Sequence, residues 1–402
     1  MAVTEPTTLP PAAWMTRPGL ARLATALGAD EGAARYVGGA VRDTLLGLPV
    51  ADIDVATIHP PREVVRRLQA ARIKAIPTGI AHGTITAVAD GTVVEVTTLR
   101  RDVTTDGRHA EVAFTDDWQA DAARRDFTMN ALYADMGDHR LYDYFGGIAD
   151  LRDGRVRFIG DPLRRIAEDH LRILRFFRFL ARFGDAPDAQ GLAACIARAN
   201  DLMALSRERI ADELLKLLVA RDAVGVVRLM VDRAIWQPVL PEFDAAAVER
   251  LAALVDAEAS AGMAPDPVRR LAALLNAGNA EGATARLKLS NAQRKRIAVA
   301  LGSITDAPLA LGYRLGVEGA VDRLLLAGDP TAATTVAAWT RPTLPLSGGA
   351  LVERGLARGP DVARALRQVE DRWIAEGFPD TERTAAIADA VVAQALRASS
   401  NA

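Results

Sequence analysis

The hydrophobic pattern of this 402-residue chain changes near residue 150, and each side of the change permits a different class of structure. Residues 36–145 mix short β-like runs with helix signals, which is typical of a domain built from both strands and helices. From about residue 150 onward the pattern is helical and rich in Ala and Leu. The sequence therefore predicts an α+β fold, in which a head with a sheet precedes an all-α remainder.

Local patterns predict individual elements of the head. A β-like run ends just before Gly38-Gly39, and a helix-like stretch follows at residues 40–46. Farther along, residues 83–89 and 92–98 are β-like and are separated by Asp90-Gly91, a dipeptide typical of tight hairpin turns. We therefore expect an antiparallel hairpin here and a sheet as the scaffold of the head.

The helical part contains start signals and two breaks. Asp266-Pro267 has the residue types preferred at the N-cap and the first position of a helix, and residues 290–293 resemble a capping box. Gly, Pro and Ser concentrate at residues 259–267 and 340–349, where we expect connections between helices. The sequence shows no repeat at a fixed period, which excludes a regular solenoid.

The charge distribution shows whether a polyanion would be bound by the overall charge of the protein or by a local basic patch. The formal net charge is −2, which excludes a protein that holds nucleic acid through overall positive charge. The stretch from Arg152 to Arg182, however, contains nine arginines and four acidic residues, which gives it a charge of +5. A nucleic acid or a nucleotide would therefore be met by a local patch.

Other features bear on where the protein resides. No stretch approaches the ~20 consecutive apolar residues that a membrane-spanning helix requires. The single cysteine, Cys195, cannot form a disulfide within the chain, and the first ten residues lack the pattern of a signal peptide. We therefore expect a cytoplasmic protein without a membrane segment.

Three carboxylates are candidates for metal chemistry. If Asp52 and Asp54 lie on a strand, both project from the same face, because successive side chains alternate. Paired carboxylates at this spacing suit Mg²⁺, although an Asp-x-Asp pair also occurs on ordinary solvated turns. Glu95 stands in an apolar strand, where burial of an unpaired carboxylate would be costly. A metal ion would relieve that cost, and so would an ion pair with Arg100 or Arg101.

A glycine pair next to a helix is a candidate phosphate site. Gly38 and Gly39 follow the first predicted strand, so that backbone N–H groups at the helix start could approach a phosphate closely. Arg42, in the same helix, would add a positive charge. A Gly-Gly pair alone more often marks a simple turn.

Five motifs of this chain occur in the order in which a known family has them. Residues 36–43 (Tyr-Val-Gly-Gly-Ala-Val-Arg-Asp) and 52–57 (Asp-Ile-Asp-Val-Ala-Thr) closely resemble the first motif of class II tRNA nucleotidyltransferases. These are the CCA-adding enzymes, which are related to bacterial poly(A) polymerases. The family's second to fifth motifs are resembled, in that order, by residues 124–131, 143–150, 168–179 and 207–209 of this chain. The resemblance is dense from residue 36 to 218 and decreases toward the C-terminus.

The resemblance implies a domain organisation. Residues 20–150 would form a catalytic nucleotidyltransferase head of the polymerase β type, with a small mixed sheet. Residues 151–220 would form an all-α neck with the nucleotide-selecting helix, and residues 221–402 an all-α body and tail that bind tRNA. The polar segment 101–109 resembles the flexible loop that the family uses when it switches from C to A addition.

The resemblance also implies roles for charged side chains. Arg124 and Arg125 would hold the triphosphate or the ribose, and Asp126 would orient one of them. The competing interpretation of these three residues is a structural cluster of ion pairs. Arg175 and Arg178 would reach the base or the triphosphate, whereas the apolar residues between them, including Phe176 and Phe177, are expected to pack in the core.

Base selection is expected from Asp169 and Arg172. If both lie on a helix, their spacing of three makes them neighbours, so that an acceptor stands beside a donor. Cytosine and adenine each offer an amine beside a ring acceptor, whereas guanine and uracil reverse that order and would leave like polarities opposed. A solvated helix with ion pairs three residues apart is the alternative for such a run.

The resemblance implies template-independent addition of CCA to a tRNA that lacks it, with CTP and ATP as substrates. Asp52 and Asp54, with Glu95, would bind two Mg²⁺ ions, and pyrophosphate would leave. No obligatory protein partner is expected. The alternatives are a bacterial poly(A) polymerase, an enzyme that adds only CC or only A, a catalytically silent RNA-binding protein, and a nucleotidyltransferase acting on a small molecule.

Overall fold

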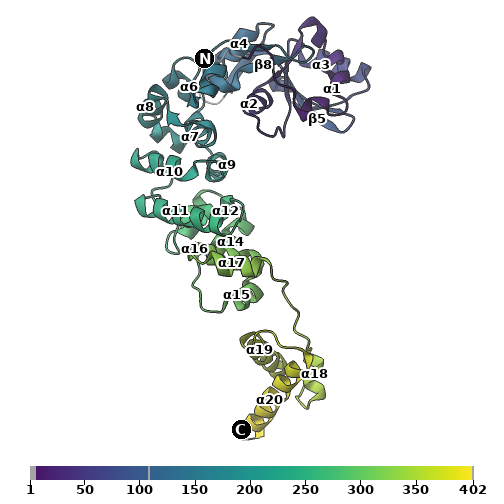
Figure 1. Cartoon of the computed structure of the whole chain (residues 1–402), viewed down its shortest axis with the longest axis vertical. Helices are drawn as coiled ribbons and strands as arrows, with labels where there is room; N and C mark the ends of the chain where they lie inside the picture. Colours follow the sequence, from purple (N-terminus) through teal and green to yellow (C-terminus); the bar gives the residue numbers. More distant parts are fainter. Residues whose placement is uncertain (1–5, 107–108, 401–402) are drawn as a thin grey trace. The chain divides into compact units, whose positions relative to one another are not determined.

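The computed structural model describes residues 6–106 and 109–400. The chain divides into two compact units, and the division falls between Pro241 and Glu242. The boundaries expected near residues 150 and 220 both lie within the first unit. The first unit combines a sheet with helices, whereas the described part of the second contains helices and loops without a strand (Figure 1). The predicted α+β class is therefore confirmed.

A seven-stranded sheet in the order β3-β4-β5-β2-β1-β8-β9 forms the centre of the head, among the residues described. Its strands are β1 (Ala34–Val37), β2 (Asp54–Thr57), β3 (Lys74–Gly79), β4 (Thr84–Ala89), β5 (Thr92–Thr98), β8 (Leu132–Asp135) and β9 (Leu141–Asp143). The sheet is mixed, because β2 and β5 run parallel whereas the other neighbours are antiparallel. The parallel pair aligns Asp54 with Glu95.

The local predictions for the head are confirmed. β4 and β5 form the expected antiparallel hairpin, in which Ala89 faces Thr92. The two turn residues have positive φ, 49° at Asp90 and 86° at Gly91, as a tight primed turn requires. The stretch after the first strand forms helix α2 (Gly39–Leu45).

Short helices surround the sheet and lead away from it. They are α1 (Leu20–Ala26), α3 (Pro61–Ala70), α4 (Trp118–Ala123), α5 (Gly147–Arg152), α6 (Pro162–Glu168), α7 (Arg172–Phe183), α8 (Ala189–Ala197), α9 (Arg207–Leu218) and α10 (Ala223–Asp232). Helix α7 buries Phe176 and Phe177, and the Phe176 ring stacks on Phe158 with centroids 5.6 Å apart. These aromatic residues pack in the core, as predicted.

The segment expected to be a flexible loop forms most of a second hairpin. β6 (Arg100–Asp106) and β7 (His109–Phe114) pair antiparallel, and residues 107 and 108 of the expected loop lie outside the described residues. Arg100 donates to the His82 carbonyl at 2.8 Å, which attaches the base of this hairpin to the turn before β4. Two further short strands, β10 (Arg155–Val156) and β11 (Ala186–Pro187), pair in parallel. The prediction that residues 151–220 are all-α is therefore wrong at this point, because the extended segments before α6 and α8 pair with each other.

The second unit consists of helices α11 to α20. They are α11 (Ala245–Ser260), α12 (Pro267–Leu274), α13 (Ala280–Arg286), α14 (Asn291–Ala300), α15 (Pro308–Leu315), α16 (Val317–Leu326), α17 (Pro330–Ala337), α18 (Gly348–Glu353), α19 (Pro360–Ala375) and α20 (Thr381–Ser400). The two expected breaks fall between α11 and α12 and between α17 and α18. Asp266 caps α12 through its carboxylate, and Ser290 with Gln293 forms the predicted capping box of α14.

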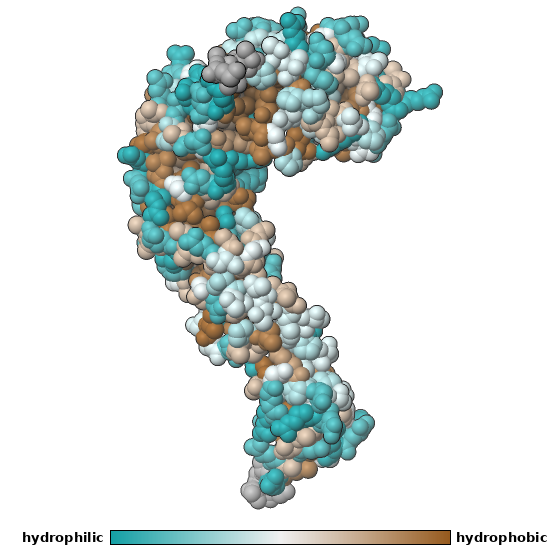
Figure 2. Space-filling view, in the orientation of Figure 1, coloured by the Kyte–Doolittle hydropathy of each residue, from teal (hydrophilic) through white to brown (hydrophobic). Residues whose placement is uncertain are grey.

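The interior of the second unit contains both charges and apolar residues. Arg269 binds Glu258 and Asp322, each at 2.8 Å, and all three side chains are buried. Residues of α15 and α18–α20 enclose an apolar cluster around Trp373. The visible face of α19 and α20 is mostly hydrophilic (Figure 2). No helix among the described residues is long and apolar enough to span a membrane.

Candidate active site

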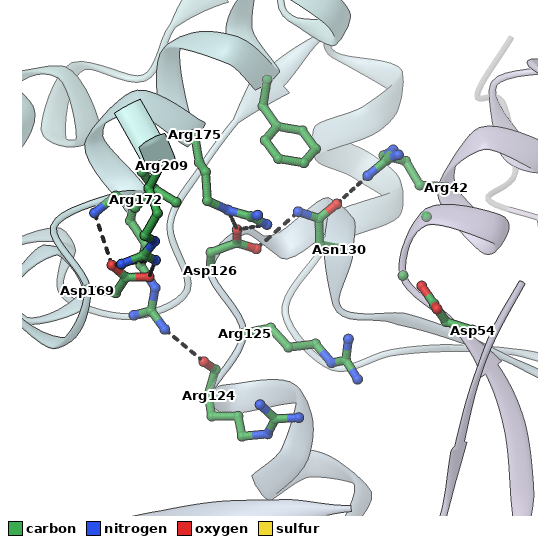
Figure 3. A pocket seen from close by; sticks show the side chains of 14 residues that line it. Arg42, Asp54, Arg124, Arg125, Asp126, Asn130, Asp169, Arg172, Arg175 and Arg209 are labelled. Carbon is green, nitrogen blue, oxygen red and sulfur yellow. Dashed lines mark hydrogen bonds and ion pairs between the residues drawn. The ribbon is translucent and has the colours of Figure 1, made fainter. Parts of the chain in front are cut away.

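Two pockets adjoin at Asp54 in the head. The first has a volume of about 400 Å³ and is lined mainly by polar and cationic side chains, so we call it the arginine-lined pocket (Figure 3). Its charged residues are Arg42, Asp54, Arg124, Arg125, Asp126, Asp169, Arg172, Arg175 and Arg209. The second, the carboxylate pocket, has a volume of about 770 Å³ and is lined by Asp52, Asp54 and Glu95, with Arg17 as its cation. Asp54 lies where a group in one pocket could react with a group in the other.

The carboxylate pocket brings the three predicted carboxylates together. Asp52 is exposed and precedes β2, which begins at Asp54, so the expected strand covers only one member of the pair. The alternation nevertheless holds, because Ile53 and Val55 are buried between and beside the two aspartates. Glu95 is exposed rather than buried, which corrects the premise that burial of its charge needs relief. Its relevance comes instead from its register opposite Asp54.

Asp54 stands out electrostatically. Burial and the nearby Glu95 carboxylate raise the pKa of Asp54 to about 6, with a further contribution from Asp52. The guanidiniums of Arg125 and Arg42 act in the opposite direction. A carboxylate whose pKa is raised in a pocket is a common mark of a functional site. The repulsion between Asp54 and its neighbouring carboxylates would be relieved by a bound cation.

The donor set fits a hard divalent cation that is shared with a substrate. Within residues 6–106 and 109–400, no three His, Cys, Asp or Glu side chains converge closely enough to hold a metal by themselves. Mg²⁺ is commonly bound through one or two carboxylates together with substrate phosphates and water. Asp52 and Asp54 offer two carboxylates, and the arginine-lined pocket beside them has the charge to hold a phosphate chain.

The glycine pair forms one wall of the arginine-lined pocket. Gly38 has φ 67° and ψ −121°, a conformation that L side chains rarely adopt, and α2 begins at Gly39. The buried Arg42 pairs with Asp43 at 2.7 Å, and its Nη1 donates to Asn130 at 2.5 Å. The backbone of the two glycines and a fixed guanidinium therefore border the pocket, although the N–H of Gly38 is bonded to the Leu132 carbonyl at 3.1 Å.

Arg124 and Arg125 are held by Asp121, which was not predicted as a site residue although it stands three and four positions before them, a spacing that makes helix side chains neighbours. Asp121, 1% exposed, accepts from Arg124 through one oxygen at 2.8 Å and from Arg125 through the other at 2.9 Å. The Tyr133 hydroxyl donates to the same carboxylate at 2.7 Å. Burial alone would raise the pKa of Asp121, but Arg125, Arg124 and Tyr133 together lower it to about 2. This carboxylate therefore stays ionised and keeps both guanidiniums in place.

Asp126 orients an arginine other than the two beside it. Its Oδ2 accepts from Arg175 Nε at 2.7 Å, and its Oδ1 accepts from Asn130 Nδ2 at 3.0 Å (Figure 3). Asn130 in turn accepts from Arg42 of α2. These contacts therefore link α2 to α7 through side chains that line the pocket. Burial opposes ionisation of Asp126, but Arg175 and Asn130 outweigh it and lower its pKa.

The two residues expected to select the base both line the pocket, but they do not share a helix. Asp169 is extended, with φ −153° and ψ 107°, and α7 begins only at Arg172. Its Oδ1 accepts from the Leu171 backbone N–H at 3.1 Å, so Asp169 stands at the start of α7 rather than on it. Arg209 of α9 donates to both carboxylate oxygens of Asp169, at 2.8 and 3.1 Å. The fifth motif thus supplies a direct partner to the fourth.

The remaining arginines of α7 divide between the pocket and the helical core. Arg172 donates to Glu168 at 2.5 Å and to the Arg165 carbonyl at 2.9 Å. Arg178 donates to the buried Glu213 of α9 at 2.5 Å and is not among the residues that line the pocket. Arg175 and Arg178 therefore have different surroundings, although the sequence expectation treated them alike.

The third motif, residues 143–150, is hydrogen-bonded to the second, residues 124–131. Asp143 accepts backbone N–H bonds from Gly147 at 2.9 Å and Ile148 at 2.8 Å, which fixes the start of α5. The buried Asp150 accepts from Thr128 at 2.6 Å and from Arg157 at 2.9 Å. These bonds tie the turn that carries Asn130 to α5 and to Arg157, directly after β10.

Comparison with known proteins agrees with this geometry. Residues 34–157 match the family model described as the poly A polymerase head domain, and residues 187–247 match the probable RNA and SrmB-binding site of polymerase A. The human mitochondrial CCA tRNA nucleotidyltransferase 1 is 35% identical over 372 residues, which cover 86% of this chain and 83% of that protein. The CCA-adding enzyme of Staphylococcus epidermidis is 39% identical over 191 residues, which cover 47% of this chain and 46% of that protein.

Solved structures extend the similarity to nearly the whole chain. The Bacillus stearothermophilus CCA-adding enzyme in complex with CTP has a TM-score of 0.72 and 26% identity, and covers 96% of this chain and 100% of its own. The Thermotoga maritima CCA-adding enzyme complexed with tRNA has a TM-score of 0.67 at 20% identity and covers 93% and 94%, which shows a shared fold. The five ordered motifs, the two adjoining pockets and these relatives establish that the chain belongs to the family of class II CCA tRNA nucleotidyltransferases, the CCA-adding enzymes.

Proposed function

We propose that this protein adds CCA to the 3′ end of tRNA, one nucleotide at a time, from CTP and ATP and without a nucleic-acid template. The observation that supports this most directly is the position of Asp54 between the two pockets. A nucleoside triphosphate in the arginine-lined pocket and an RNA 3′ end in the carboxylate pocket would meet at this residue. Transfer of the nucleotide to the 3′-hydroxyl would break the bond between the α- and β-phosphates and release pyrophosphate.

The arginine-lined pocket would hold the nucleotide. Arg124 and Arg125, held by Asp121, would neutralise the triphosphate, and the backbone at Gly38 and Gly39 would allow phosphate oxygens to approach closely. Arg42 would add charge at the same wall. Because these cations are already positioned by buried hydrogen bonds, little reorganisation would be needed when a nucleotide binds.

Family membership implies use of a divalent metal, and we propose that the metal is Mg²⁺. Asp52 and Asp54 would hold it, and Glu95 lies opposite Asp54 where it could contribute. When bound, Mg²⁺ lowers the pKa of an attacking hydroxyl and stabilises charge that develops on a phosphate. The carboxylates of this chain would then orient the 3′-hydroxyl for in-line attack on the α-phosphate.

Selection of C and A would depend on Asp169 and Arg172, which line the same pocket. An acceptor beside a donor matches the amine and ring nitrogen of cytosine and adenine, and opposes like groups in uracil and guanine. Arg175 would contact the base or the triphosphate, whereas Arg178, which does not line the pocket, would support α7 through Glu213. Arg209 would fix the direction in which Asp169 presents its oxygens.

The helical part of the chain would bind the tRNA. We propose that residues 151–220 form a neck that presents the base-selecting residues and that residues 221–402 contact the tRNA. The deep, narrow major groove of an A-form helix hides its base edges from side chains, so these contacts would be made to phosphates and to shape. Binding should therefore weaken steeply as the salt concentration rises.

The decisive experiment is extension of a tRNA transcript that lacks its 3′ CCA, with Mg²⁺ and each nucleoside triphosphate alone and in pairs. We expect two residues to be added with CTP alone and three with CTP plus ATP, followed by a stop. Addition of CC only, or of A only onto a transcript ending in CC, would identify a partial enzyme. Long ladders with ATP alone, independent of the tRNA fold, would identify a poly(A) polymerase, which the description of the head-domain family model makes the second candidate.

We also propose a cytoplasmic location. The single cysteine, Cys195, is a buried free thiol, which is compatible with a reducing compartment. The human and mouse relatives are named as mitochondrial, so fractionation of cells with detection of the native chain is the appropriate test.

A further inference from the structure

A segment that precedes the matched head region contacts both ends of the connection that leads to Asp52. The short helix η1 (Ala13–Thr16) buries Trp14, whose Nε1 donates to Thr44 Oγ1 at 2.8 Å in the last turn of α2. Immediately after η1, the Arg17 guanidinium donates to the Val50 carbonyl at 2.8 Å and to the Ala51 carbonyl at 3.1 Å. The connection between α2 and β2 is thus held at its start and at its end.

Asp52 needs such support more than Asp54 does. Asp54 begins β2 and is aligned with β5 by the sheet. Asp52 is exposed and lies in a stretch, residues 48–53, without helix or strand. The two peptide groups that Arg17 binds are those directly before Asp52, and a guanidinium can engage two carbonyls at once in a fixed geometry.

Arg17 also lies in the carboxylate pocket itself, together with Asp52, Asp54 and Glu95. Arg17 thereby brings a positive charge to a lining that is otherwise rich in carboxylates. The family model that matches the head begins at residue 34, so the match does not include Arg17. A role for Arg17 therefore has to be argued from its contacts in this structure.

We infer that Arg17 is a positioning residue for Asp52, which it places for metal binding by holding the Val50 and Ala51 carbonyls. The inference rests on the proposed function, in which Asp52 is a metal ligand. Loss of a residue that orients a metal ligand commonly costs roughly 10- to 100-fold in metal affinity or activity. The nucleotide should be affected much less, because Arg17 is not among the residues that line the arginine-lined pocket.

The test compares full-length wild type with Arg17→Ala and Arg17→Lys. The matched control is Arg22→Ala, because Arg22 is a nearby arginine whose exposed ion pair with Asp90, at 2.7 Å, lies outside both pockets. The readouts are kcat, KM for CTP, and Mn²⁺ affinity measured by electron paramagnetic resonance without nucleotide. Hydrogen exchange of residues 50–53 in the metal-free protein, and tRNA binding at several salt concentrations, are measured alongside.

We expect Arg17→Ala to lower kcat and Mn²⁺ affinity by roughly 10- to 100-fold with an unchanged KM for CTP. Exchange at residues 50–53 should accelerate, Arg17→Lys should recover only part of the loss, and Arg22→Ala should behave as wild type. Unchanged Mn²⁺ affinity and exchange in Arg17→Ala would overturn the inference. Weaker tRNA binding with a smaller salt dependence, at unchanged Mn²⁺ affinity, would also overturn it and make Arg17 an RNA contact.

Failure of the proposed function is distinguishable from failure of this inference. A wild type that binds Mn²⁺ but adds no CCA would contradict the proposed function, whereas the Mn²⁺ affinities and exchange rates of the variants would still decide the role of Arg17.

Discussion

Arg209 donates to both carboxylate oxygens of Asp169, although the two residues are separated by 40 positions in the chain. This contact joins α9 to the turn before α7 and fixes the acceptor that we assign to base selection. Asp169 is not held by a helix of its own, because it is extended between α6 and α7. Its direction therefore depends on a side chain from another helix.

Arg209→Ala should reduce discrimination between CTP and UTP. An unpaired polar group costs the wrong base about 1–3 kcal/mol, which corresponds to roughly 5- to 150-fold in the ratio of kcat/KM values. Part of this discrimination is lost when the acceptor is no longer fixed. Single-nucleotide addition with each triphosphate measures this ratio. Lys216→Ala, which removes an exposed ion pair with Asp212 on the same helix, should leave the ratio unchanged. Equal losses for CTP and UTP in Arg209→Ala would contradict a role in selection.

Asp52→Ala should abolish turnover and largely spare tRNA binding. We propose that this carboxylate holds the metal at the reaction centre, and we expect the tRNA to be held by the helical part of the chain. Extension assays measure the first effect and filter binding the second. Asp212→Ala, which removes an exposed carboxylate of α9, serves as the control. A parallel loss of both properties would refute this assignment.

Asp121→Asn should weaken binding of both nucleotides and alter stability in acid. The pKa of Asp121 in the folded protein is about 2, below the ordinary value of about 3.9. A depressed pKa stabilises the fold above pH ~4, and this contribution, about 2 kcal/mol, is lost as the pH falls toward 2. We expect the variant to unfold at lower denaturant concentration at pH 7 and to lose less stability than wild type between pH 4 and pH 2. KM should rise for CTP and ATP alike, and a change confined to one nucleotide would contradict the common role in holding Arg124 and Arg125.

Gly147→Ala should destabilise the head. A Cβ at Gly147 would lie 2.4 Å from the Thr128 carbonyl oxygen, which is backbone and cannot move aside cheaply. Overpacking of this kind costs about 1–3 kcal/mol. Gly282→Ala is the matched control, because its Cβ would meet nothing within 4 Å and alanine favours the interior of α13. Denaturant unfolding at fixed pH measures both variants, and equal stabilities would show that the turn at Thr128 can yield.

Local patterns were sufficient for much of the secondary structure. The hairpin at β4 and β5 follows from Asp90-Gly91, and the start of α14 follows from Ser290 and Gln293, because turns and caps are made by residues close in sequence. Nine of the ten residues that the resemblance implied for nucleotide binding line the arginine-lined pocket, and Arg178 does not. Asn130 and Arg209, which also line it, were not predicted as site residues. The hairpin turn and the helix cap depend on interactions between residues close in sequence, so local sequence patterns are sufficient to predict them.

The partners of the site residues were decided by tertiary structure. Glu95 is an exposed neighbour of Asp54, and Arg209 is the partner of Asp169. The bonds from Arg124 and Arg125 to Asp121 are local by contrast, at spacings of three and four residues, and only the burial of Asp121 comes from the fold. Arg17 reaches the residues before Asp52 from the N-terminal segment. A hydrogen bond between distant residues depends on strand register and helix packing, which the sequence near either residue does not encode. The sequence by itself thus determined the fold class and the chemistry of the site, and the fold determined which carboxylate holds which guanidinium.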